Sequence, residues 1–282
     1  MTRRNYALLA TKVLAISLCL CPTLLLPCIA AQSTEKPIKD KWALVVGINQ
    51  FRSGHNLHFA ASDAKSFADY LIENAGFAPD HVKLLTDRDA SRLNIIKAIG
   101  EDWLPRRVDE DDLVVIYMGT HGSSDKSDII GSNYLITSDT EGGALYSTAI
   151  PTQDFLRIIR TRIPARNVVL VLDACFSGAA QTDERAGWAQ GIDADEIFAG
   201  TKQVVICSSA PGEVAFEAPE LRAGVFTHFL ADNLKSSDRI TIKESFDKAS
   251  QQVIEHTHGN QHPILKTKPG GEELILASKS TL

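Results

Sequence analysis

Residues 167–178 read NVVLVLDACFSG. The run begins with apolar residues that are typical of a strand buried on both faces, and it ends in Asp173 and Cys175 before Gly178 lets the chain turn. Residues two positions apart on a strand project to the same face. This stretch therefore predicts a buried strand that delivers a carboxylate and a thiol together to its carboxyl end.

The chain around this stretch alternates between short apolar runs and segments with helical spacing. Strands are expected at residues 42–48, 81–85, 113–118, 168–172, 203–207 and 273–277, with a small hairpin around residues 134–137. Helices are expected at residues 60–74, 91–103, 152–160, 226–234 and 242–256, the second with Ser91 as its N-cap. Continuous Val, Ile and Leu runs separated by helices predict an α/β fold with a mostly parallel sheet covered on both faces. One domain over residues 41–278, preceded by a linker at residues 31–40, is the simplest division.

The first thirty residues differ in composition from the rest. Two arginines and a lysine form a basic start, residues 13–27 are almost wholly apolar, and small residues follow. This order predicts a secretory signal peptide over residues 1–30, cleaved near Ala30 or Ala31, and export to the periplasm or the exterior. If the segment stayed uncleaved, residues 13–31 would just span a bilayer and anchor the chain in a membrane. The arginine pair leaves both Sec and twin-arginine export open.

Charge and cysteine content narrow the class of function. The formal net charge of -6 becomes -9 without residues 1–30, because that segment holds three cations and no acid. An acidic chain without a Lys/Arg cluster argues against a nucleic-acid partner and fits a protein that handles basic substrates. Only Cys175 and Cys207 lie outside the leader, so a disulfide-rich scaffold is excluded, while a single bridge between these two remains open.

Two of the expected strands end in groups that can do chemistry together. One leads into His121-Gly122 and the other into Asp173-Ala174-Cys175. The ligand crevice of an open α/β sheet lies beyond the carboxyl ends of its strands, so His121 and Cys175 meet there if their strands are neighbours. An imidazole helps to hold a thiol as the nucleophilic thiolate and later protonates a leaving amine. The main-chain N–H groups of Gly122 and Cys175 would then form an oxyanion hole.

This combination resembles the caspase-like cysteine peptidases, in particular their metacaspase and paracaspase branches. The resemblance extends over nearly all of residues 41–278 and includes the segments WALVVGI, LHFAASDAKSFADYL, VVICSSAPGEVAFE and GVFTHFL. It implies a three-layer α-β-α sandwich with a central, mostly parallel six-stranded sheet. It also implies a cysteine-type endopeptidase that works through a thioacyl-enzyme without a required cofactor, with His121 as general acid/base and Cys175 as nucleophile.

The resemblance also suggests a substrate. Metacaspases and paracaspases cleave after Arg or Lys, and the acids of their first specificity pocket correspond to Asp63 and Asp173 here. A buried carboxylate needs a partner, which the guanidinium of a basic protein or peptide substrate can supply bidentately. The alternative for Asp63 is that it only caps the helix that begins near it. Ser208 and Ser209, which follow an expected strand on the same edge, are candidates for lining the substrate cleft.

Calcium dependence is left open. Many metacaspases need calcium, and the candidate ligands here are Asp125, Asp128, Asp139 and Glu141. EF-hand spacing is absent, and polar loops are often acidic for solubility alone. No His pair has a Cys or Asp partner at metal-ligand spacing, so no metal site is assigned.

Two classes other than a peptidase remain open. One is a catalytically silent relative that binds basic peptides or acts as an assembly partner. The other is a structural thiol protein with a Cys175–Cys207 bridge. Relatives are often cut in the region after the nucleophile during activation, which makes Arg185 and Lys202 candidate self-cleavage points.

Overall fold

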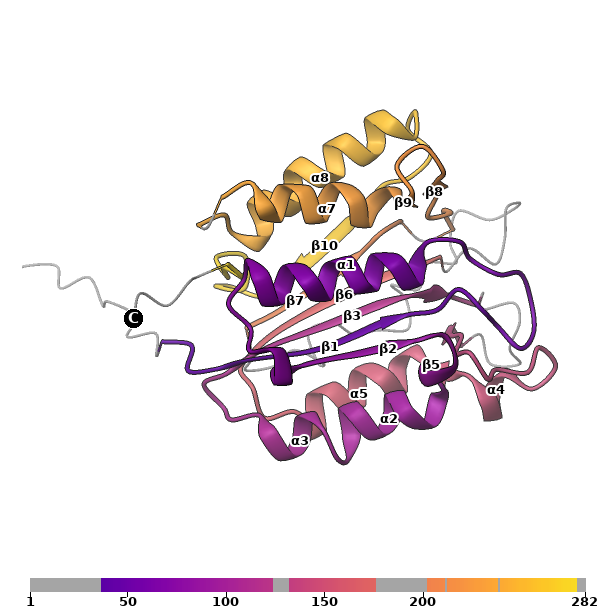
Figure 1. The fold of residues 1–282 in the computed structure, drawn as a ribbon, viewed down its shortest axis with the longest axis horizontal. Helices are drawn as coiled ribbons and strands as arrows, with labels where there is room; N and C mark the ends of the chain where they lie inside the picture. Colours follow the sequence, from indigo (N-terminus) through magenta and orange to yellow (C-terminus); the bar gives the residue numbers. More distant parts are fainter. Residues whose placement is uncertain (1–36, 124–131, 176–201, 211, 238, 278–282) are drawn as a thin grey trace, which may run out of the picture. The chain divides into compact units, whose positions relative to one another are not determined.

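Six strands form a central sheet in the computed structural model, in the order β10-β7-β6-β3-β1-β2 (Figure 1). The structure describes residues 37–123, 132–175, 202–210, 212–237 and 239–277. The strands are β1 Lys41–Gly47, β2 Val82–Thr86, β3 Leu113–His121, β6 Asn167–Cys175, β7 Lys202–Cys207 and β10 Ile264–Thr267. All neighbours pair in parallel except β10, which runs antiparallel to β7. The predicted mostly parallel six-stranded sheet is confirmed.

Helices cover both faces of this sheet (Figure 1). One layer holds α1 Ala60–Glu73, α7 Val225–Lys235 and α8 Ile242–His256, and the other holds α2 Arg92–Gly100, α3 Leu104–Arg107 and α5 Thr152–Arg162. Three shorter helical elements are α4 Leu145–Thr148 and the 3-10 turns η1 Pro79–His81 and η2 Asp87–Asp89. Two small antiparallel strand pairs lie outside the central sheet. In the first, β4 Tyr134–Leu135 pairs with β5 Ile150–Pro151, and in the second, β8 Glu217–Ala218 pairs with β9 Ala223–Gly224. The arrangement is the expected three-layer α-β-α sandwich.

The two cores follow from the alternation of side chains along each strand. In β1, Leu44 and Val46 pack with α2 and α5, whereas Ala43 and Val45 pack with α1 and α7. Because successive residues of a strand point to opposite faces, an uninterrupted apolar strand serves both layers at once. The continuous apolar runs therefore predicted burial on both faces correctly.

Three expected elements differ in the structure. In place of the small hairpin expected around residues 134–137, Tyr134–Leu135 forms β4, which pairs antiparallel with β5 at Ile150–Pro151. Residues 273–277 do not form the last strand of the sheet; β10 takes that place, and Ile275 makes only an isolated bridge to Thr241. Leu274 and Leu276 are buried in the core, so the apolar pattern there marks packing without strand pairing. The helix expected at residues 91–103 ends at Gly100, although Ser91 is its N-cap as expected and accepts a hydrogen bond from the Asn94 N–H at 3.3 Å.

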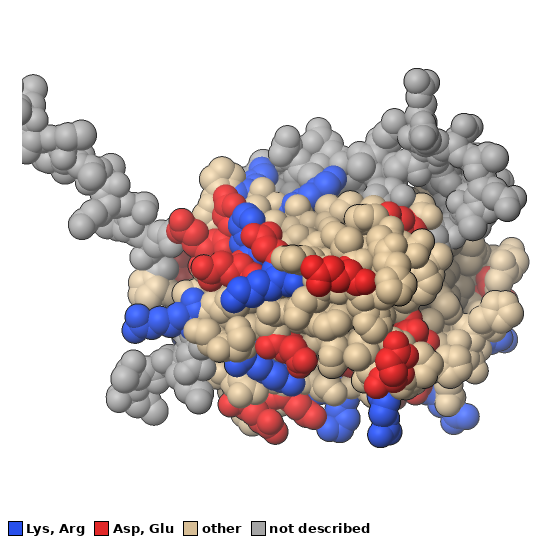
Figure 2. Space-filling view, turned by 90° about the horizontal axis from the view of Figure 1, so that it is seen from above, with Lys and Arg blue, Asp and Glu red and all other residues tan. Residues whose placement is uncertain are grey.

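Charged side chains of both signs lie side by side on the face that α7 and α8 form (Figure 2). Lys243 and Asp247, one turn apart on α8, pair at 2.6 Å. Such i, i+4 pairs stabilise a helix only slightly and keep its surface solvated.

Several sequence expectations lie outside the described residues. These are the signal peptide and most of the linker, the candidate calcium ligands Asp125 and Asp128, and the candidate self-cleavage point Arg185. Within the part of the chain that the structure describes, no helix has the length and apolarity that crossing a membrane requires.

Candidate active site

The ends of β3 and β6 lie next to each other in the middle of the sheet. Their parallel register pairs His121 with Cys175 and Gly119 with Asp173. The two strands are therefore neighbours, as the sequence interpretation required. Residues separated by 54 positions in the chain reach the same edge of the sheet because both strands run in the same direction and end at the same level.

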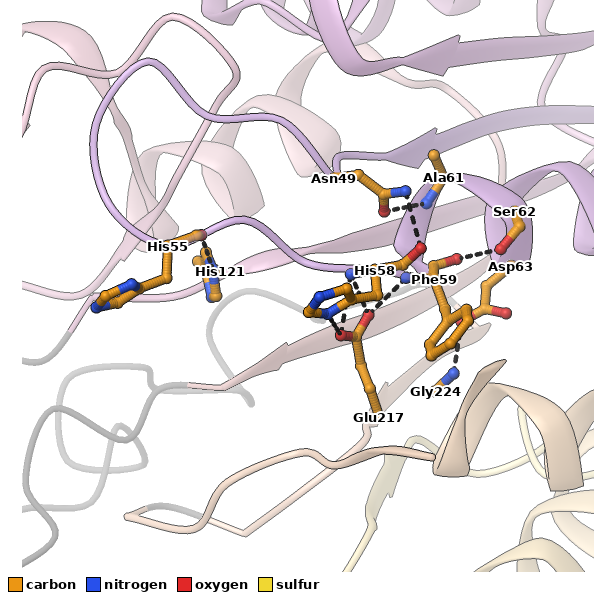
Figure 3. Close-up of polar contacts among 10 residues, drawn as sticks. All are labelled: Asn49, His55, His58, Phe59, Ala61, Ser62, Asp63, His121, Glu217 and Gly224. Atoms are coloured by element: carbon orange, nitrogen blue, oxygen red, sulfur yellow. Dashed lines mark hydrogen bonds and ion pairs between the residues drawn. The ribbon is translucent and has the colours of Figure 1, made fainter. Parts of the chain in front are cut away.

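The ring of His121 is held from one side by a main-chain carbonyl (Figure 3). Its Nε2 lies 2.8 Å from the carbonyl oxygen of His55, and its ring centroid lies 4.7 Å from that of Phe51. A carbonyl oxygen only accepts hydrogen bonds, so Nε2 is the nitrogen that carries the proton. In the neutral ring this leaves Nδ1 with the lone pair that can accept a proton.

The pairing with β4 does not use the amide of Gly122. The carbonyl of His121 accepts from the Ile136 N–H, and the Ser123 N–H donates to the Tyr134 carbonyl, both at 2.9 Å. Gly122 and Leu135 lie opposite each other between these two hydrogen bonds and form a non-hydrogen-bonded pair of the antiparallel bridge. In such a pair, the N–H and C=O groups of each residue point away from the opposite strand. The Gly122 N–H is thus not consumed by the neighbouring strand.

A pocket with three carboxylates in its lining opens beside His121. We call it the acidic pocket and define it by Asp63, Asp173 and Glu217. The rest of its lining is small, apolar or main-chain in character: Leu57, Ala60, Gly119, Thr120, Ala215, Phe216 and Gly224. The structure thus brings together three of the four residues that the resemblance singled out for catalysis or specificity, and it pairs the fourth, Cys175, with His121 in the sheet register.

Asp63 is buried at 6% exposure in the first turn of α1. Its Oδ2 accepts a hydrogen bond from the Gly224 N–H at 2.8 Å (Figure 3). Burial raises the pKa of Asp63 to about 7, with Asp173 and Glu217 adding to the rise and the Gly224 N–H opposing it. The interpretation of Asp63 as a simple cap is wrong, because the N-cap of α1 is Phe59 and the carboxylate bonds across to β9 instead.

Asp173 is surrounded by hydroxyl groups. Its Oδ2 accepts from the Thr227 hydroxyl at 2.6 Å and from the Tyr117 hydroxyl at 3.4 Å. The Tyr117 hydroxyl also lies 2.9 Å from the Thr227 hydroxyl, and because it carries a single proton it donates to only one of these two oxygens at a time. Burial raises the pKa of Asp173, and the hydrogen bond from Thr227 opposes that rise by favouring the carboxylate.

Gly224 lets the two carboxylates of α1 and β6 converge. A Cβ atom at this position would lie 3.2 Å from Oδ2 of Asp63 and 3.3 Å from Oδ2 of Asp173. Both oxygens therefore approach the same Cα, which only glycine leaves without a side chain. The result is a site with two facing carboxyl groups and no Lys or Arg side chain among the described residues of its lining.

Ser208 and Ser209 are buried and do not contribute to the lining of the acidic pocket, although the Ser208 hydroxyl lies near Asp173 and opposes the rise in the pKa of that carboxyl. Their exposures are 0% and 5%, and the Ser208 carbonyl accepts from Nε2 of Gln261 at 2.8 Å. Cys207 is a free buried thiol whose pKa burial raises to about 12, so it stays protonated. Cys207 forms no disulfide bridge in the part of the chain that the structure describes.

The two described candidates for calcium ligands have other partners. Oδ1 of Asp139 accepts from the Arg92 N–H at 2.8 Å and from the Thr137 hydroxyl at 2.7 Å, and Glu141 pairs with Arg52 at 2.8 Å. Within the described part of the chain, no group of three or more His, Cys, Asp or Glu side chains could hold a metal ion.

Sequence reasoning missed Glu217, Gly224, Thr227 and Tyr117. The first three lie in the segments VVICSSAPGEVAFE and GVFTHFL, which carried the resemblance without any role for these residues. No spacing rule links these four residues to Asp63 or Asp173, because they come from β8, β9, α7 and β3, more than 40 positions away in the chain.

Comparison with known proteins identifies the family of the chain. The model of a family described as "Caspase domain" matches residues 40–271, so the chain belongs to the caspase domain family. Metacaspase-1 of Yarrowia lipolytica is 27% identical over 158 residues, which cover 50% of this chain and 32% of that relative. Metacaspase-1 of Scheffersomyces stipitis is 28% identical over 160 residues, covering 50% of this chain and 36% of that relative. The chain thus spans about a third of the length of these relatives.

A solved structure shows the same fold. The crystal structure of a protein from Geobacter sulfurreducens superposes with a TM-score of 0.61 and covers 84% of this chain and 97% of its own, at 18% identity. At this identity the likeness concerns the fold alone.

Proposed function

We propose that this chain is a cysteine-type endopeptidase that cleaves peptide bonds after Arg, and also after Lys. The single observation that carries the proposal is the β3–β6 register, which pairs His121 with Cys175 beside the acidic pocket. Membership in the caspase domain family supports cysteine peptidase activity in general. In this proposal His121 and Cys175 form the catalytic dyad, and Asp63 and Asp173 hold the substrate cation.

The chemistry follows from the groups at the two strand ends. Nδ1 of His121 takes the proton of the Cys175 thiol, the thiolate attacks the scissile carbonyl carbon, and the N–H groups of Gly122 and Cys175 stabilise the charge on its oxygen. Nδ1 of His121 then protonates the departing amine as the C–N bond breaks, leaving a thioacyl-enzyme. Water, deprotonated by the same nitrogen, releases the acyl group and restores the thiol. The His55 carbonyl supports this cycle because it keeps the proton of the resting ring on Nε2.

The acidic pocket favours a guanidinium for geometric reasons. Two carboxylate oxygens converge on Gly224, and a planar guanidinium can donate to both at once. A Lys ammonium supplies the same charge without the matching fork, so we expect weaker binding of Lys. The positive charge of the substrate would also oppose the rise that burial causes in the pKa of Asp63. Binding of the cation and ionisation of Asp63 would therefore favour each other.

The remaining expectations belong to this proposal. We infer that the enzyme needs no organic cofactor, that calcium stimulates it only if ligands outside the described residues supply a site, and that it is exported after removal of residues 1–30. Its partners would be proteins or peptides with basic residues. A membrane association would follow only if the leader stayed uncleaved.

Turnover of short peptides ending in Arg, Lys or Asp, with and without calcium, tests the proposal. We expect the wild type to release the leaving group after Arg and less rapidly after Lys, and Cys175→Ala to be inactive. Cleavage after Asp would overturn the assignment of the acidic pocket while leaving the dyad intact. Cleavage of none of the peptides, with tight binding of the Arg peptide, would favour a catalytically silent peptide-binding protein.

A further inference from the structure

Helix α1 begins without a cap from its own sequence. Its N-cap residue, Phe59, makes no side-chain capping hydrogen bond. The first N–H groups of a helix have no partner within it and need one from elsewhere. Side chains from outside the helix supply acceptors here (Figure 3). Oδ1 of Asn49 accepts from the Ala61 N–H in the first turn at 2.9 Å. The carboxylate of Glu217, on β8 and far along the chain, accepts from the N–H of the N-cap residue Phe59 at 2.7 Å and from the His58 N–H just before it at 3.0 Å.

The same carboxylate also has a solvent-exposed contact with the ring of His58. Nδ1 of His58 lies 3.2 Å from Oε2 of Glu217. The side chain of Glu217 is 22% exposed, whereas that of His58 is 78% exposed. The positive end of the α1 dipole adds a favourable field for a carboxylate at this position.

The segment that Glu217 holds is also the segment that orients His121. The His55 carbonyl, which accepts from Nε2 of His121 at 2.8 Å, lies three residues before His58 (Figure 3). Asn49 secures the stretch between them, since the Leu57 N–H donates to its carbonyl at 3.0 Å and its Nδ2 donates to the His58 carbonyl at 3.1 Å. Movement at the start of α1 would therefore shift the carbonyl that positions the imidazole.

Glu217 also belongs to the acidic pocket. It lines the pocket together with Asp63 and Asp173, and its charge acts on both of those carboxylates. It thus touches the recognition site on one side and the support of His121 on the other. Among the described residues of the pocket lining, Glu217 is the one whose side chain also accepts hydrogen bonds from the main chain of residues 58 and 59.

We propose that Glu217 is a positioning residue that links the acidic pocket to His121, by fixing residues 55–59 through its hydrogen bonds to the N–H groups of His58 and Phe59. This rests on the proposed function, in which His121 is the acid and base. Glu217 acts in it by hydrogen bonds to the main chain and not as a required ligand of the substrate cation. Its loss should therefore slow the chemical steps more than it weakens binding.

Kinetics of Glu217→Ala and Glu217→Gln on an Arg peptide test this role. Glu217→Ala removes every acceptor, so we expect kcat to fall about tenfold to a hundredfold, the scale that misplacement of a catalytic group produces, with KM changed by less than about threefold. Glu217→Gln keeps Oε1 as the acceptor for the two N–H groups, and we expect it to retain kcat within about threefold. A rise in KM at unchanged kcat in both variants would overturn the proposal and make Glu217 a substrate ligand. Loss of kcat in Glu217→Gln as large as in Glu217→Ala would also overturn it.

Two variants serve as matched controls. His58→Ala keeps the main-chain N–H and loses only the exposed ring, so kcat should stay near that of the wild type. Glu220→Ala removes an acid of equal charge three residues along the chain, which pairs with His256 and is 64% exposed. It should leave both kcat and KM unchanged, because this carboxylate has no contact with residues 55–59.

Measurements that need no turnover separate this inference from the proposed function. Amide hydrogen exchange of residues 55–59 should speed up in Glu217→Ala and not in Glu220→Ala. The pH profile for alkylation of Cys175, followed by peptide mass spectrometry on the full chain, should move toward that of an ordinary thiol in Glu217→Ala only. An active wild type with unchanged exchange and alkylation in Glu217→Ala would overturn the positioning role alone. A wild type without turnover, whose Cys175 behaves as an ordinary thiol, would overturn the proposed function and this inference with it.

Discussion

Asp63 illustrates how one buried carboxylate prepares a site for a cation. It lies on a helix, where an acid in the first turn is common, yet its environment is set by β9 and β6 across the pocket. The sequence marked Asp63 and Asp173 through their place beside recognisable motifs. It carried no local signal for Glu217 or Gly224, because their roles depend on which carboxylates lie opposite them in space.

The raised pKa of Asp63 predicts a change of stability with pH. Its folded-state value of about 7 lies above the ordinary value of 3.8, so folding favours the protonated acid. The corresponding stability is fully present below about pH 4 and is lost as the pH rises through 7. We expect Asp63→Asn to remove this loss, so that the variant gains about 2–4 kcal/mol relative to the wild type between pH 4 and pH 8.

Urea unfolding of both proteins across this pH range measures the effect. Asp69→Asn is the matched control, since Asp69 lies on the same helix but is half-exposed and pairs with Lys65 at the surface. Its difference from the wild type should stay nearly constant with pH. Parallel stability curves for Asp63→Asn and the wild type would show that Asp63 titrates normally in the folded state.

Gly224→Ala should damage recognition of Arg without unfolding the protein. Its φ of -63° suits alanine, but the new methyl group would lie 3.2–3.3 Å from both carboxylate oxygens and would push them apart. We expect KM for an Arg peptide to rise at least about tenfold, with unfolding free energy changed by less than about 1 kcal/mol.

Steady-state kinetics and urea unfolding check this prediction together. Gly143→Ala is the control, because a Cβ there meets no atom within 4 Å, and it should leave KM unchanged. Unaltered KM in Gly224→Ala would mean that the substrate cation does not lie between the two carboxylates.

At the scale of elements, the packing of α1 against β1 places one wall of the acidic pocket. Gly47 ends β1, and a Cβ there would lie 2.2 Å from the Ala60 carbonyl oxygen and 2.5 Å from Cβ of Ala64. The helix therefore approaches the strand as closely as main-chain atoms allow. This closeness positions Asp63, which lies between Ala60 and Ala64 in the same turn.

Gly47→Ala should consequently destabilise the fold. The clash is with a main-chain oxygen inside a helix, which cannot move aside as a flexible side chain would. We expect the free energy of unfolding to fall by at least about 3 kcal/mol, measured by urea denaturation, or the protein to be recovered only in aggregates. Gly142→Ala, where the nearest atom lies at an ordinary 3.5 Å, is the comparison. Wild-type stability of Gly47→Ala would mean that α1 and β1 are farther apart than described.

A helix or strand was predicted correctly where residues close together in the sequence mark both its type and its two ends. Helix α8 was predicted with its observed bounds because its sequence contains both ends, including a capping box in which Thr241 and Glu244 bond reciprocally. The strand expected at residues 273–277 failed, since alternating burial is shared by strands and by irregular segments that pack on a core. Pairing partners decide between these two, and a single sequence does not show them.

At the scale of the whole molecule, Lys41 joins distant parts of the domain. Its side chain is buried at 8% exposure, and Nζ donates to the Ala75 carbonyl at 2.7 Å and to the Leu276 carbonyl at 2.9 Å. Burial lowers the pKa of Lys41. The start of the first strand is thereby tied to the end of the described chain, 235 residues later.

Lys41→Met should loosen that end of the domain. Methionine fills a similar volume without donating, so two buried carbonyls lose a partner. We expect amide hydrogen exchange of residues 272–277 to speed up, with little change in β3 and β6, and a loss of about 1–3 kcal/mol in unfolding free energy. Lys39→Met, at an exposed ion pair with Asp109, should change neither. Unchanged exchange of residues 272–277 would show that Lys41 does not hold this segment.

The α/β class, the alternation of buried strands with helices, and the two strand ends that carry His121 and Cys175 can all be predicted from the amino-acid sequence, because period, continuity and motif spacing are local properties of the chain. Three features appear only in the folded protein: β10 closes the sheet, Gly224 lets Asp63 and Asp173 come together, and Glu217 binds the N–H groups of His58 and Phe59 just before α1. Those features depend on contacts across more than 40 positions, and such contacts arise from packing that no local pattern records.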